Sequence, residues 1–225
     1  MIVQIYSMTS VADAVATARA GADLVGVVVA EPGVVPEAID ERLAREIIGS
    51  IRPWARGVAL SLSADPEEIC AIVDAVRPDI LHLAARALSP EDSGWLRRRI
   101  APVQVMRAIP VRGGEAVAEA DAHQEVADYL IVDSGAIGLP FTGSTGETHD
   151  WSISRQIVER SRIPVILAGG LSPHNVESAI AQVRPWGVDS FTHTDRSGSR
   201  GIKDMVRVRA FIAASHRGFA AIAEG

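Results

Sequence analysis

The sequence has little of what several classes of protein require. Among its 225 residues there is one cysteine, Cys70, and only 4% are aromatic. A single cysteine excludes an intramolecular disulfide framework and a multi-cysteine metal cluster within the chain. No apolar run approaches the roughly 20 residues that a membrane-spanning helix needs. The N-terminus enters an apolar run at once, without the basic region and cleavage site of a secretory leader, so we expect a cytoplasmic location.

The charge balance excludes further partners. The chain carries 22 basic and 28 acidic residues, a formal net charge of −6, and no polybasic run. Such a balance disfavours a nucleic-acid or anionic-membrane surface. A small anionic ligand remains compatible with it, because a few backbone N–H groups can hold one locally.

What the sequence does contain is a regular alternation of short β-branched apolar runs with longer segments of helical periodicity. The apolar runs fall at 2–6, 23–29, 57–62, 79–83, 103–109, 128–132, 164–168 and 187–191. Eight such pairs are the pattern of parallel βαβ units. With 48% hydrophobic residues, the chain suits the aliphatic, layered core of a parallel barrel. We therefore predict an α/β protein, a single (β/α)8 TIM barrel domain over residues 1–225.

Helix starts are marked by residues whose side-chain oxygen can cap a helix. The candidate caps are Ser10 or Thr9, Ser63, Ser89 and Ser172. Two of the serines precede proline, which is favoured at the first helical position because its missing N–H costs little there. Cys70 falls inside the helix predicted after Ser63 and is interpreted as a small buried apolar residue.

One connection is longer than an ordinary turn. After the sixth predicted strand, residues 133–150 form a glycine-rich stretch. A long loop at the C-terminal end of a barrel strand is a suitable place for a lid over an active site. The alternative is a surface insertion without a role.

The C-terminal ends of the strands are where a βα barrel builds its active site. Gly169 and Gly170 follow the seventh strand and suit a phosphate group, because unpaired N–H groups and the positive end of a helix dipole converge at such turns. Ser190, Thr192 and His193 follow the eighth strand and would complete the phosphate site, with His193 as a charge-assisted donor. The alternative is that the glycine pair is only a tight turn.

Three stretches of the sequence resemble the phosphoribosylanthranilate isomerase family, in the same order and near the same strands. They are VQIYSMTSVADAVATARAGADLVGVVV, then YLIVDSGA followed by GSTGETHDW, and last PVILAGGLSPHNVESAIAQVRPWGVD running on to GIKD. The resemblance spans essentially the whole chain, and LAGGLSPHNV with RPWGVD is its most specific part. It implies an isomerase of the Amadori or aldose-ketose type, acting in tryptophan biosynthesis on a phosphorylated sugar or aminosugar. We expect no metal and no cofactor, and a monomer or homodimer.

The family's reaction needs an acid that protonates the sugar ring oxygen and a base that removes the proton from C2′. The resemblance implies that Asp133 is the acid; the alternative is a carboxylate that accepts backbone N–H bonds as a cap. Where the family has its basic cysteine this chain has Tyr6, a poor base with an ordinary pKa of about 10, which either shapes the pocket or joins the chemistry. His82 ends the fourth strand and, with an ordinary pKa of about 6.5, is the candidate replacement base; a hydrogen-bonded core histidine is the alternative.

Other positions also depart from the family. Pro32 aligns with an arginine able to pair an aromatic carboxylate, so a bidentate partner for anthranilate is lost. Phe191, Thr192 and His193 stand where the family has Ser-Ser-Gly. Because the thiol and the arginine are both absent, we expect turnover of the family's own substrate to be weak or absent.

Three further residues are candidates for the substrate pocket, and two other functions fit the sequence. Ser7, Arg107 and Thr145 are predicted to line the substrate pocket. One alternative function is a phosphate-ligand-binding homologue that has lost turnover. The other is a metal-dependent phosphosugar epimerase or aldolase, although the second and third strands lack the His and Asp partners that such a site uses.

Overall fold

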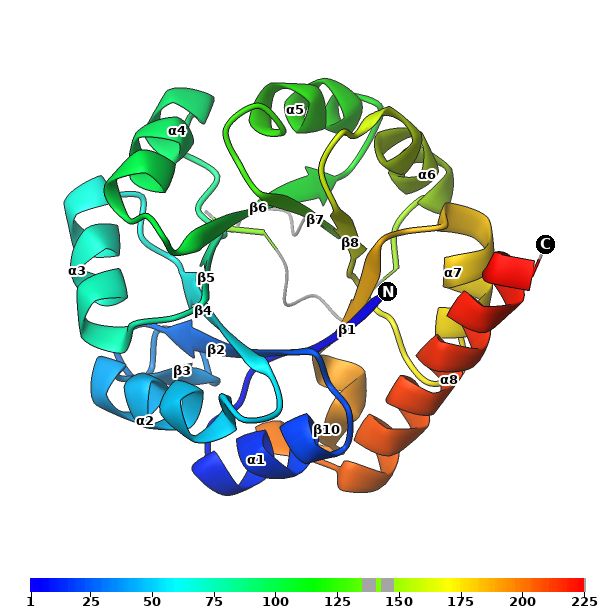
Figure 1. The fold of residues 1–225 in the computed structure, drawn as a ribbon, viewed down its shortest axis with the longest axis horizontal. Coiled ribbons are helices and arrows are strands. Elements are labelled where there is room, and N and C mark those ends of the chain that lie inside the picture. Colours follow the sequence, from blue (N-terminus) through cyan, green and yellow to red (C-terminus); the bar gives the residue numbers. More distant parts are fainter. Residues whose placement is uncertain (135–140, 143–147, 225) are drawn as a thin grey trace.

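The structure, a computed structural model, describes residues 1–134, 141–142 and 148–224. Within these residues eight parallel strands close into a barrel, which Figure 1 shows surrounded by helices. The barrel strands are β1 (Ile2–Ile5), β2 (Leu24–Val29), β4 (Arg56–Ser61), β5 (Ile80–Leu83), β6 (Gln104–Val111), β7 (Tyr129–Ser134), β8 (Val165–Leu167) and β9 (Gly187–Ser190). Since β1 pairs with both β2 and β9, the sheet closes, and the predicted (β/α)8 TIM barrel is confirmed.

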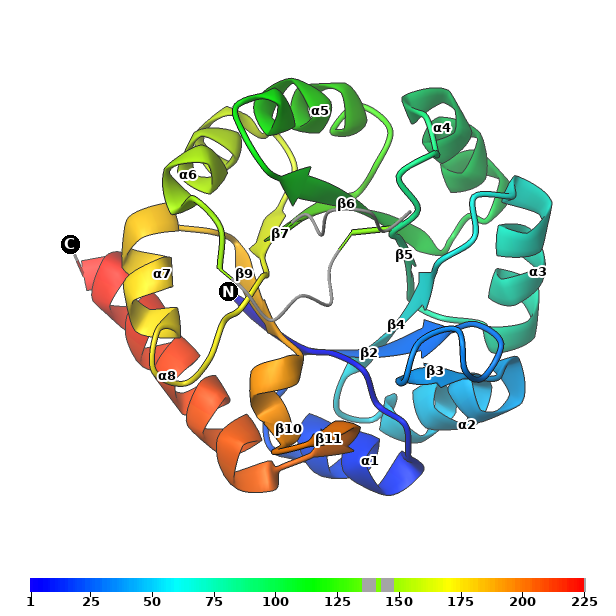
Figure 2. The same ribbon diagram turned by 180° about the vertical axis from the view of Figure 1, so that it is seen from behind.

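The helices form the outer ring, and Figures 1 and 2 show it from the two ends of the barrel. They are α1 (Val11–Arg19), α2 (Glu41–Ile51), α3 (Pro66–Val76), α4 (Pro90–Arg99), α5 (Glu115–His123), α6 (Trp151–Arg160), α7 (Val176–Val183) and α8 (Met205–Glu224). In the described part of the chain, no helix is long and apolar enough to cross a membrane.

Short elements extend this plan at two places. The strand β3 (Ala38–Ile39) pairs with β2 outside the barrel. After β9 the chain forms a 3₁₀ turn, η1 (Thr192–Thr194), and then an antiparallel hairpin of β10 (Asp195–Arg196) and β11 (Ser199–Lys203). The hairpin lies beside α1, as Figure 2 shows.

The helix caps agree with the sequence at two of four positions. Ser10 and Ser89 accept the expected backbone N–H bonds, and Ser89 forms a full capping box. Ser63 is not the cap of α3, because Asp65 stands directly before Pro66 and takes that role. Ser172 is not the cap of α7 either, since a turn held by Asn175 delays the start of that helix to Val176.

Side chains alternate along each strand between the barrel interior and the layer under the helices. The interior cluster includes Leu24, Val28, Val58, Leu60, Ile80, Met106, Ala108, Ile131 and Ile166. Residues two positions further along these strands share the same side, so His82 follows Ile80 and Asp133 follows Ile131 toward the interior. Cys70 is buried in α3 among apolar side chains, as the sequence predicted. Which polar side chains face the barrel interior is thus determined by the alternation of side chains along each strand.

Candidate active site

A pocket at the C-terminal ends of the barrel strands gathers most of the predicted site residues. It is lined by Tyr6, Ser7, Val28, Leu60, His82, Ile131, Asp133, Thr142, Gly169, Gly170, Leu171, Asp189, Ser190, Phe191 and Thr192. Several polar side chains, apolar side chains and a glycine turn therefore face one space. This is the composition expected of a small-molecule site.

Asp133 ends β7 and faces this pocket. Its Oδ1 accepts hydrogen bonds from the backbone N–H of Ser134 (2.6 Å) and from the Ser134 hydroxyl (3.1 Å). These bonds favour the ionised carboxylate, but burial prevails and raises the pKa of Asp133 to about 6. The carboxyl group is therefore mainly ionised at neutral pH and able to take up a proton near it. Both the proton-transfer role and the capping contact proposed for Asp133 are compatible with this geometry.

Asp189, which sequence reasoning missed, lies in the same pocket. It sits in β9 opposite Gln4 of β1 and is only 7% exposed. Burial, and then the charge of Asp133, raise the pKa of Asp189 to about 8. The signal was present in the sequence, because a carboxylate in the middle of GVDSF interrupts an otherwise apolar run.

Tyr6 and His82 form a second polar pair in the barrel interior. A hydrogen bond of 2.9 Å joins Tyr6 Oη and His82 Nδ1, and the two rings meet edge to face at 5.5 Å. Burial, and then the charge of Asp189, raise the pKa of Tyr6 well above its ordinary value. Burial, and then the Arg107 charge, lower the pKa of His82 to about 3. His82 does point into the barrel as predicted, but the expected imidazole pKa near 6.5 is wrong, so His82 is a weak base here.

The glycine turn after β8 is shaped for close contact with its neighbours. Gly169 and Gly170 have φ angles of 79° and 62°, the left-handed region that glycine reaches without strain. The hydroxyl of Ser190 donates to the carbonyl of Leu171 at 2.8 Å, and Asn175 Nδ2 donates to the carbonyl of Gly170 at 3.0 Å. The turn and the strand-end segment after β9 are thereby fixed to one another, as a shared phosphate site requires.

Two other predicted site residues, His193 and Thr145, are not among the described residues of the pocket. His193 lies in η1, is exposed, and is not among the residues that line the pocket. Thr145, and most of the predicted lid, lie outside the described residues. Of that loop, Thr142 lines the pocket and its N–H donates to the carbonyl of Ala84 at 3.1 Å. The lid therefore stays a prediction.

Arg107 does not line the pocket, which corrects the prediction. Arg107 lies inside the strand β6, which runs on past it to Val111. Its neighbours Met106 and Ala108 occupy the interior, which places Arg107 on the helix side. There its guanidinium donates to the carbonyls of Leu83 (3.3 Å), Ala85 (2.7 Å) and Leu88 (3.3 Å). Arg107 thus braces the loop after β5.

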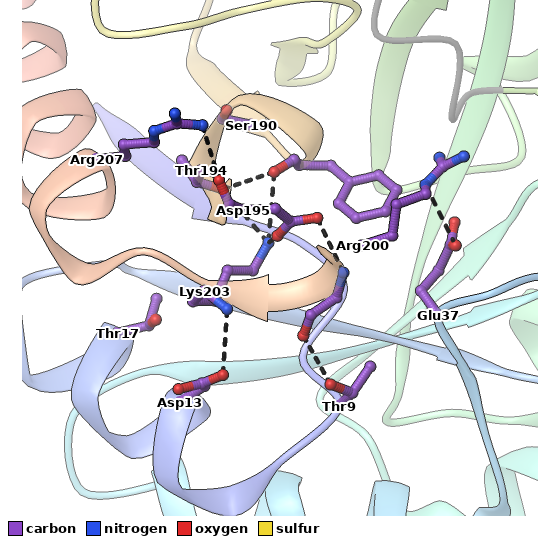
Figure 3. Close-up of polar contacts among 12 residues, drawn as sticks. Thr9, Asp13, Thr17, Glu37, Ser190, Thr194, Asp195, Arg200, Lys203 and Arg207 are labelled. Carbon is purple, nitrogen blue, oxygen red and sulfur yellow. Dashed lines mark hydrogen bonds and ion pairs between the residues drawn. The ribbon is translucent and has the colours of Figure 1, made fainter. Parts of the chain in front are cut away.

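Lys203 is a second buried charged residue near the pocket that the sequence analysis did not predict. It is the only lysine in the chain and is fully buried. Figure 3 shows its Nζ meeting the Oδ1 of Asp195 at 2.6 Å, and it also donates to the carbonyl of Phe191 (3.4 Å) and the hydroxyl of Thr194 (3.3 Å). Burial lowers the pKa of Lys203, while Asp195 opposes that shift. The ammonium group therefore holds the 191–194 segment, of which Phe191 and Thr192 line the pocket.

The same cluster ties the hairpin to the first βα unit. The second carboxylate oxygen of Asp195 accepts the Gly201 N–H at 2.9 Å, and the Thr9 hydroxyl donates to the Gly201 carbonyl at 2.6 Å. The backbone N–H of Lys203 donates to Asp13 at 3.2 Å (Figure 3). An arginine-rich chain that retains one lysine, in GIKD, was the available signal for this arrangement.

His149 packs behind the glycine turn. Its Nε2 lies 2.6 Å from the Ser154 hydroxyl, and burial lowers the pKa of its imidazole to about 4. A Cβ placed on Gly169 would lie 3.0 Å from His149 Nδ1 and from Asp133 Oδ1. Among the described residues, no group of three or more His, Cys, Asp or Glu side chains is arranged to hold a metal ion.

Comparisons with known proteins agree with this fold. The model of the family described as N-(5'phosphoribosyl)anthranilate (PRA) isomerase matches residues 3–214. The N-(5'-phosphoribosyl)anthranilate isomerase of Pseudomonas fluorescens (strain Pf0-1) is 37% identical over 209 residues, which is 93% of this chain and 95% of that protein. The isomerase of that name from Haloarcula marismortui is 33% identical over 210 residues, 93% of this chain and 94% of that protein.

Solved structures show the same relationship. The phosphoribosyl anthranilate isomerase of Thermus thermophilus superposes with a TM-score of 0.81 at 26% identity, covering 99% of this chain and 100% of that one. A phosphoribosyl anthranilate isomerase in complex with reduced 1-(o-carboxyphenylamino)-1-deoxyribulose 5-phosphate gives a TM-score of 0.78 at 27% identity, covering 96% and 100%. With a family model over nearly its whole length and relatives above 30% identity, this chain is an isomerase that belongs to the N-(5'-phosphoribosyl)anthranilate isomerase family.

Proposed function

We propose that the protein isomerises N-(5'-phosphoribosyl)anthranilate, converting a phosphorylated aminoaldose into an aminoketose within tryptophan biosynthesis. The observation that carries this proposal is the pocket in which Asp133 and Asp189 face the glycine turn and the strand-end segment after β9. It offers titratable groups for the sugar and backbone donors for the phosphate in one space. The relatives named above act as further support, since each carries the name of this activity.

The weak turnover expected from the loss of the thiol and the arginine finds no support in these comparisons. Relatives sharing 33–37% identity across almost the entire chain are all named as this isomerase. We therefore favour retained activity over a homologue that only binds phosphate ligands. We expect a monomer or a homodimer, and one solved relative is described as monomers generated from the dimeric isomerase of Thermotoga maritima.

The phosphate is proposed to lie between Gly169-Gly170 and the segment that begins at Ser190. Both glycines line the pocket, and the hydrogen bond from the Ser190 hydroxyl to the Leu171 carbonyl joins the two halves. Phosphate oxygens would accept N–H bonds from both sides. Ser190→Ala removes that bond and is expected to raise the KM for the substrate several-fold more than it lowers kcat.

The test is steady-state turnover of N-(5'-phosphoribosyl)anthranilate by the purified protein, together with binding of the reduced deoxyribulose phosphate by calorimetry. We expect kcat within the ordinary enzyme range of about 1–10³ s⁻¹. Asp133→Asn should lower kcat by about 10²-fold or more, because a positioned proton-transfer group is lost, and leave binding of the reduced compound within a few-fold. Tight binding of the reduced compound without any turnover would instead establish the phosphate-binding alternative.

A further inference from the structure

Of the described residues that line the pocket, neither Tyr6 nor His82 suits the second proton transfer. Resting on the proposed function, the reaction needs one group that donates to the ring oxygen and another that accepts the C2′ proton. The family's basic thiol is replaced by Tyr6, whose hydroxyl is committed to His82 and whose pKa is raised by burial. His82 is itself neutral and weakly basic. The second group must come from another side chain that lines the pocket.

Asp189 has the right position for this role. It lines the same pocket as Asp133, and its side chain is on the barrel interior, opposite Gln4. Its Oδ1 is buried and has no hydrogen-bond partner among the described residues. A buried polar atom without a partner is costly, so its retention at the floor of a pocket points to a partner supplied by the ligand.

The surroundings of the two carboxyl groups push their protonation states apart. Two carboxylates that share a low-dielectric site cannot both ionise cheaply. Asp133 has two hydrogen bonds from Ser134 that stabilise its charge, whereas Asp189 is buried more deeply and faces the charge of Asp133. The other charged or titratable groups that face Asp189 are Lys203 of β11, which opposes its rise in pKa, and the neutral phenol of Tyr6. When the pair of carboxyl groups holds one proton, that proton is therefore on Asp189, and Asp133 is ionised.

We propose that Asp133 and Asp189 form a carboxylate and carboxylic acid pair that replaces the thiol-based chemistry, with Asp189 as the acid and Asp133 as the base. Asp189 protonates the ring oxygen, the C1′–O bond breaks, and the nitrogen lone pair forms the iminium. Asp133 then takes the C2′ proton, and the electron pair of that C–H bond forms the C1′–C2′ double bond of a neutral enolamine. In the last step Asp133 returns its proton to C1′ while the enol hydroxyl gives its proton back to Asp189, so the ketone forms and both groups are restored.

With Asp189 as the acid and Asp133 as the base, the shape of the pH profile of kcat/KM can be predicted. Activity should rise as Asp133 ionises, near pH 6, and fall as Asp189 loses its proton, near pH 8. The two limbs are properties of the coupled pair. Asp189→Asn should lower kcat by about 10²-fold or more and abolish the alkaline limb of the remaining activity. Asp133→Asn should abolish the acid limb instead.

A matched control uses the same substitution at the other end of the barrel. Asp79 precedes β5, and its Oδ2 accepts the Gly57 N–H at 2.7 Å, away from the pocket. Asp79→Asn tests whether replacing a strand-flanking aspartate lowers activity by destabilisation alone. We expect its kcat and both limbs of its pH profile to match the unaltered protein.

A second measurement requires neither substrate nor a folded Asp189 variant. In the protein labelled with ¹³C at aspartate carboxyl carbons, one carboxyl should titrate near pH 8, and Asp133→Asn should lower that pKa because the neighbouring charge is gone. Titration of all aspartates near their ordinary values would overturn the inference. So would Asp189→Asn retaining near-normal kcat and its alkaline limb, or the two limbs following the opposite residues. An unaltered protein that titrates as expected but turns over no substrate would refute the proposed function and leave the coupled pair supported.

Discussion

Gly169 offers the sharpest test of how the pocket is built, through Gly169→Ala. Its φ of 79° is left-handed, and a Cβ there would lie 3.0 Å from Asp133 Oδ1, His149 Nδ1 and the Ser134 nitrogen. The left-handed conformation alone costs a residue with a Cβ about 1–2 kcal/mol. The three close contacts add a steric cost of about 1–3 kcal/mol, and they can be relieved only by moving Asp133 or the turn.

Gly198 supplies the matched control, because its φ is 74° and nothing lies within 4 Å of the Cβ position. Gly198→Ala should therefore carry the conformational cost alone. For a domain of this size each kcal/mol corresponds to about 2–4 °C in Tm, so Gly198→Ala is expected to lower Tm by about 2–8 °C without changing kcat. Gly169→Ala should lower Tm by several degrees more.

The decisive difference lies in activity. A displacement of about 1 Å at a reacting group commonly costs about 10²-fold in rate, so Gly169→Ala should lower kcat by 10-fold or more while Gly198→Ala does not. Differential scanning calorimetry and steady-state kinetics on both variants measure these quantities. Equal losses of Tm in the two variants, with kcat unchanged in both, would show that Gly169 is an ordinary turn glycine and that the contact with Asp133 has no catalytic meaning.

Two further predictions concern buried charges. Lys203→Met leaves the Asp195 carboxylate buried without its cation, and it should lower the free energy of unfolding in urea by about 3–5 kcal/mol. In the unaltered protein, an amine-reactive reagent should label Lys203 only after unfolding. Burial raises the folded-state pKa of Asp189 to about 8, above its unfolded value. The contribution of this group to the free energy of unfolding is therefore fully present below the unfolded-state pKa of about 3.9 and is lost progressively as the pH rises to about 8. The free energy of unfolding should therefore fall between pH 6.5 and 8, by at most about 1.4 kcal/mol per pH unit from this group, and Asp189→Asn should remove that contribution. A slope unchanged by the substitution would contradict it.

The strands were predictable because each barrel strand is a short apolar run bounded by polar or glycine residues. All eight lie within two residues of their predicted limits. The exact strand ends decide which residues reach the pocket. Because β6 continues through Pro110 to Val111, Arg107 does not lie at the end of its strand. A pattern of apolar residues does not distinguish the interior of a barrel from the layer under its helices when both are apolar. The error over Arg107 has this physical origin.

The helix starts show a similar limit. Ser89 could be recognised because serine, proline and an acidic residue stand in the order of a capping box. Ser172 also precedes proline, yet Asn175 bonds back to the Ser172 N–H and to the Gly170 carbonyl, so the turn persists for three more residues. These bonds depend on the fold of the glycine turn, which the local sequence does not specify.

Position 6 shows why one residue of the site could be located from sequence while its role could not. Sequence alone gives Tyr6 an ordinary phenol and His82 an ordinary imidazole. In the barrel, the Tyr6 ring lies so close to Gly26 on the neighbouring strand that a Cβ there would come within 2.6 Å of it, and its hydroxyl is bonded to His82. The ring therefore fills space that only a glycine leaves open. Tyr6→Cys would create a cavity and strip His82 of its partner without supplying an oriented base, and for that reason the chemistry is better assigned to the two carboxyl groups already facing the pocket.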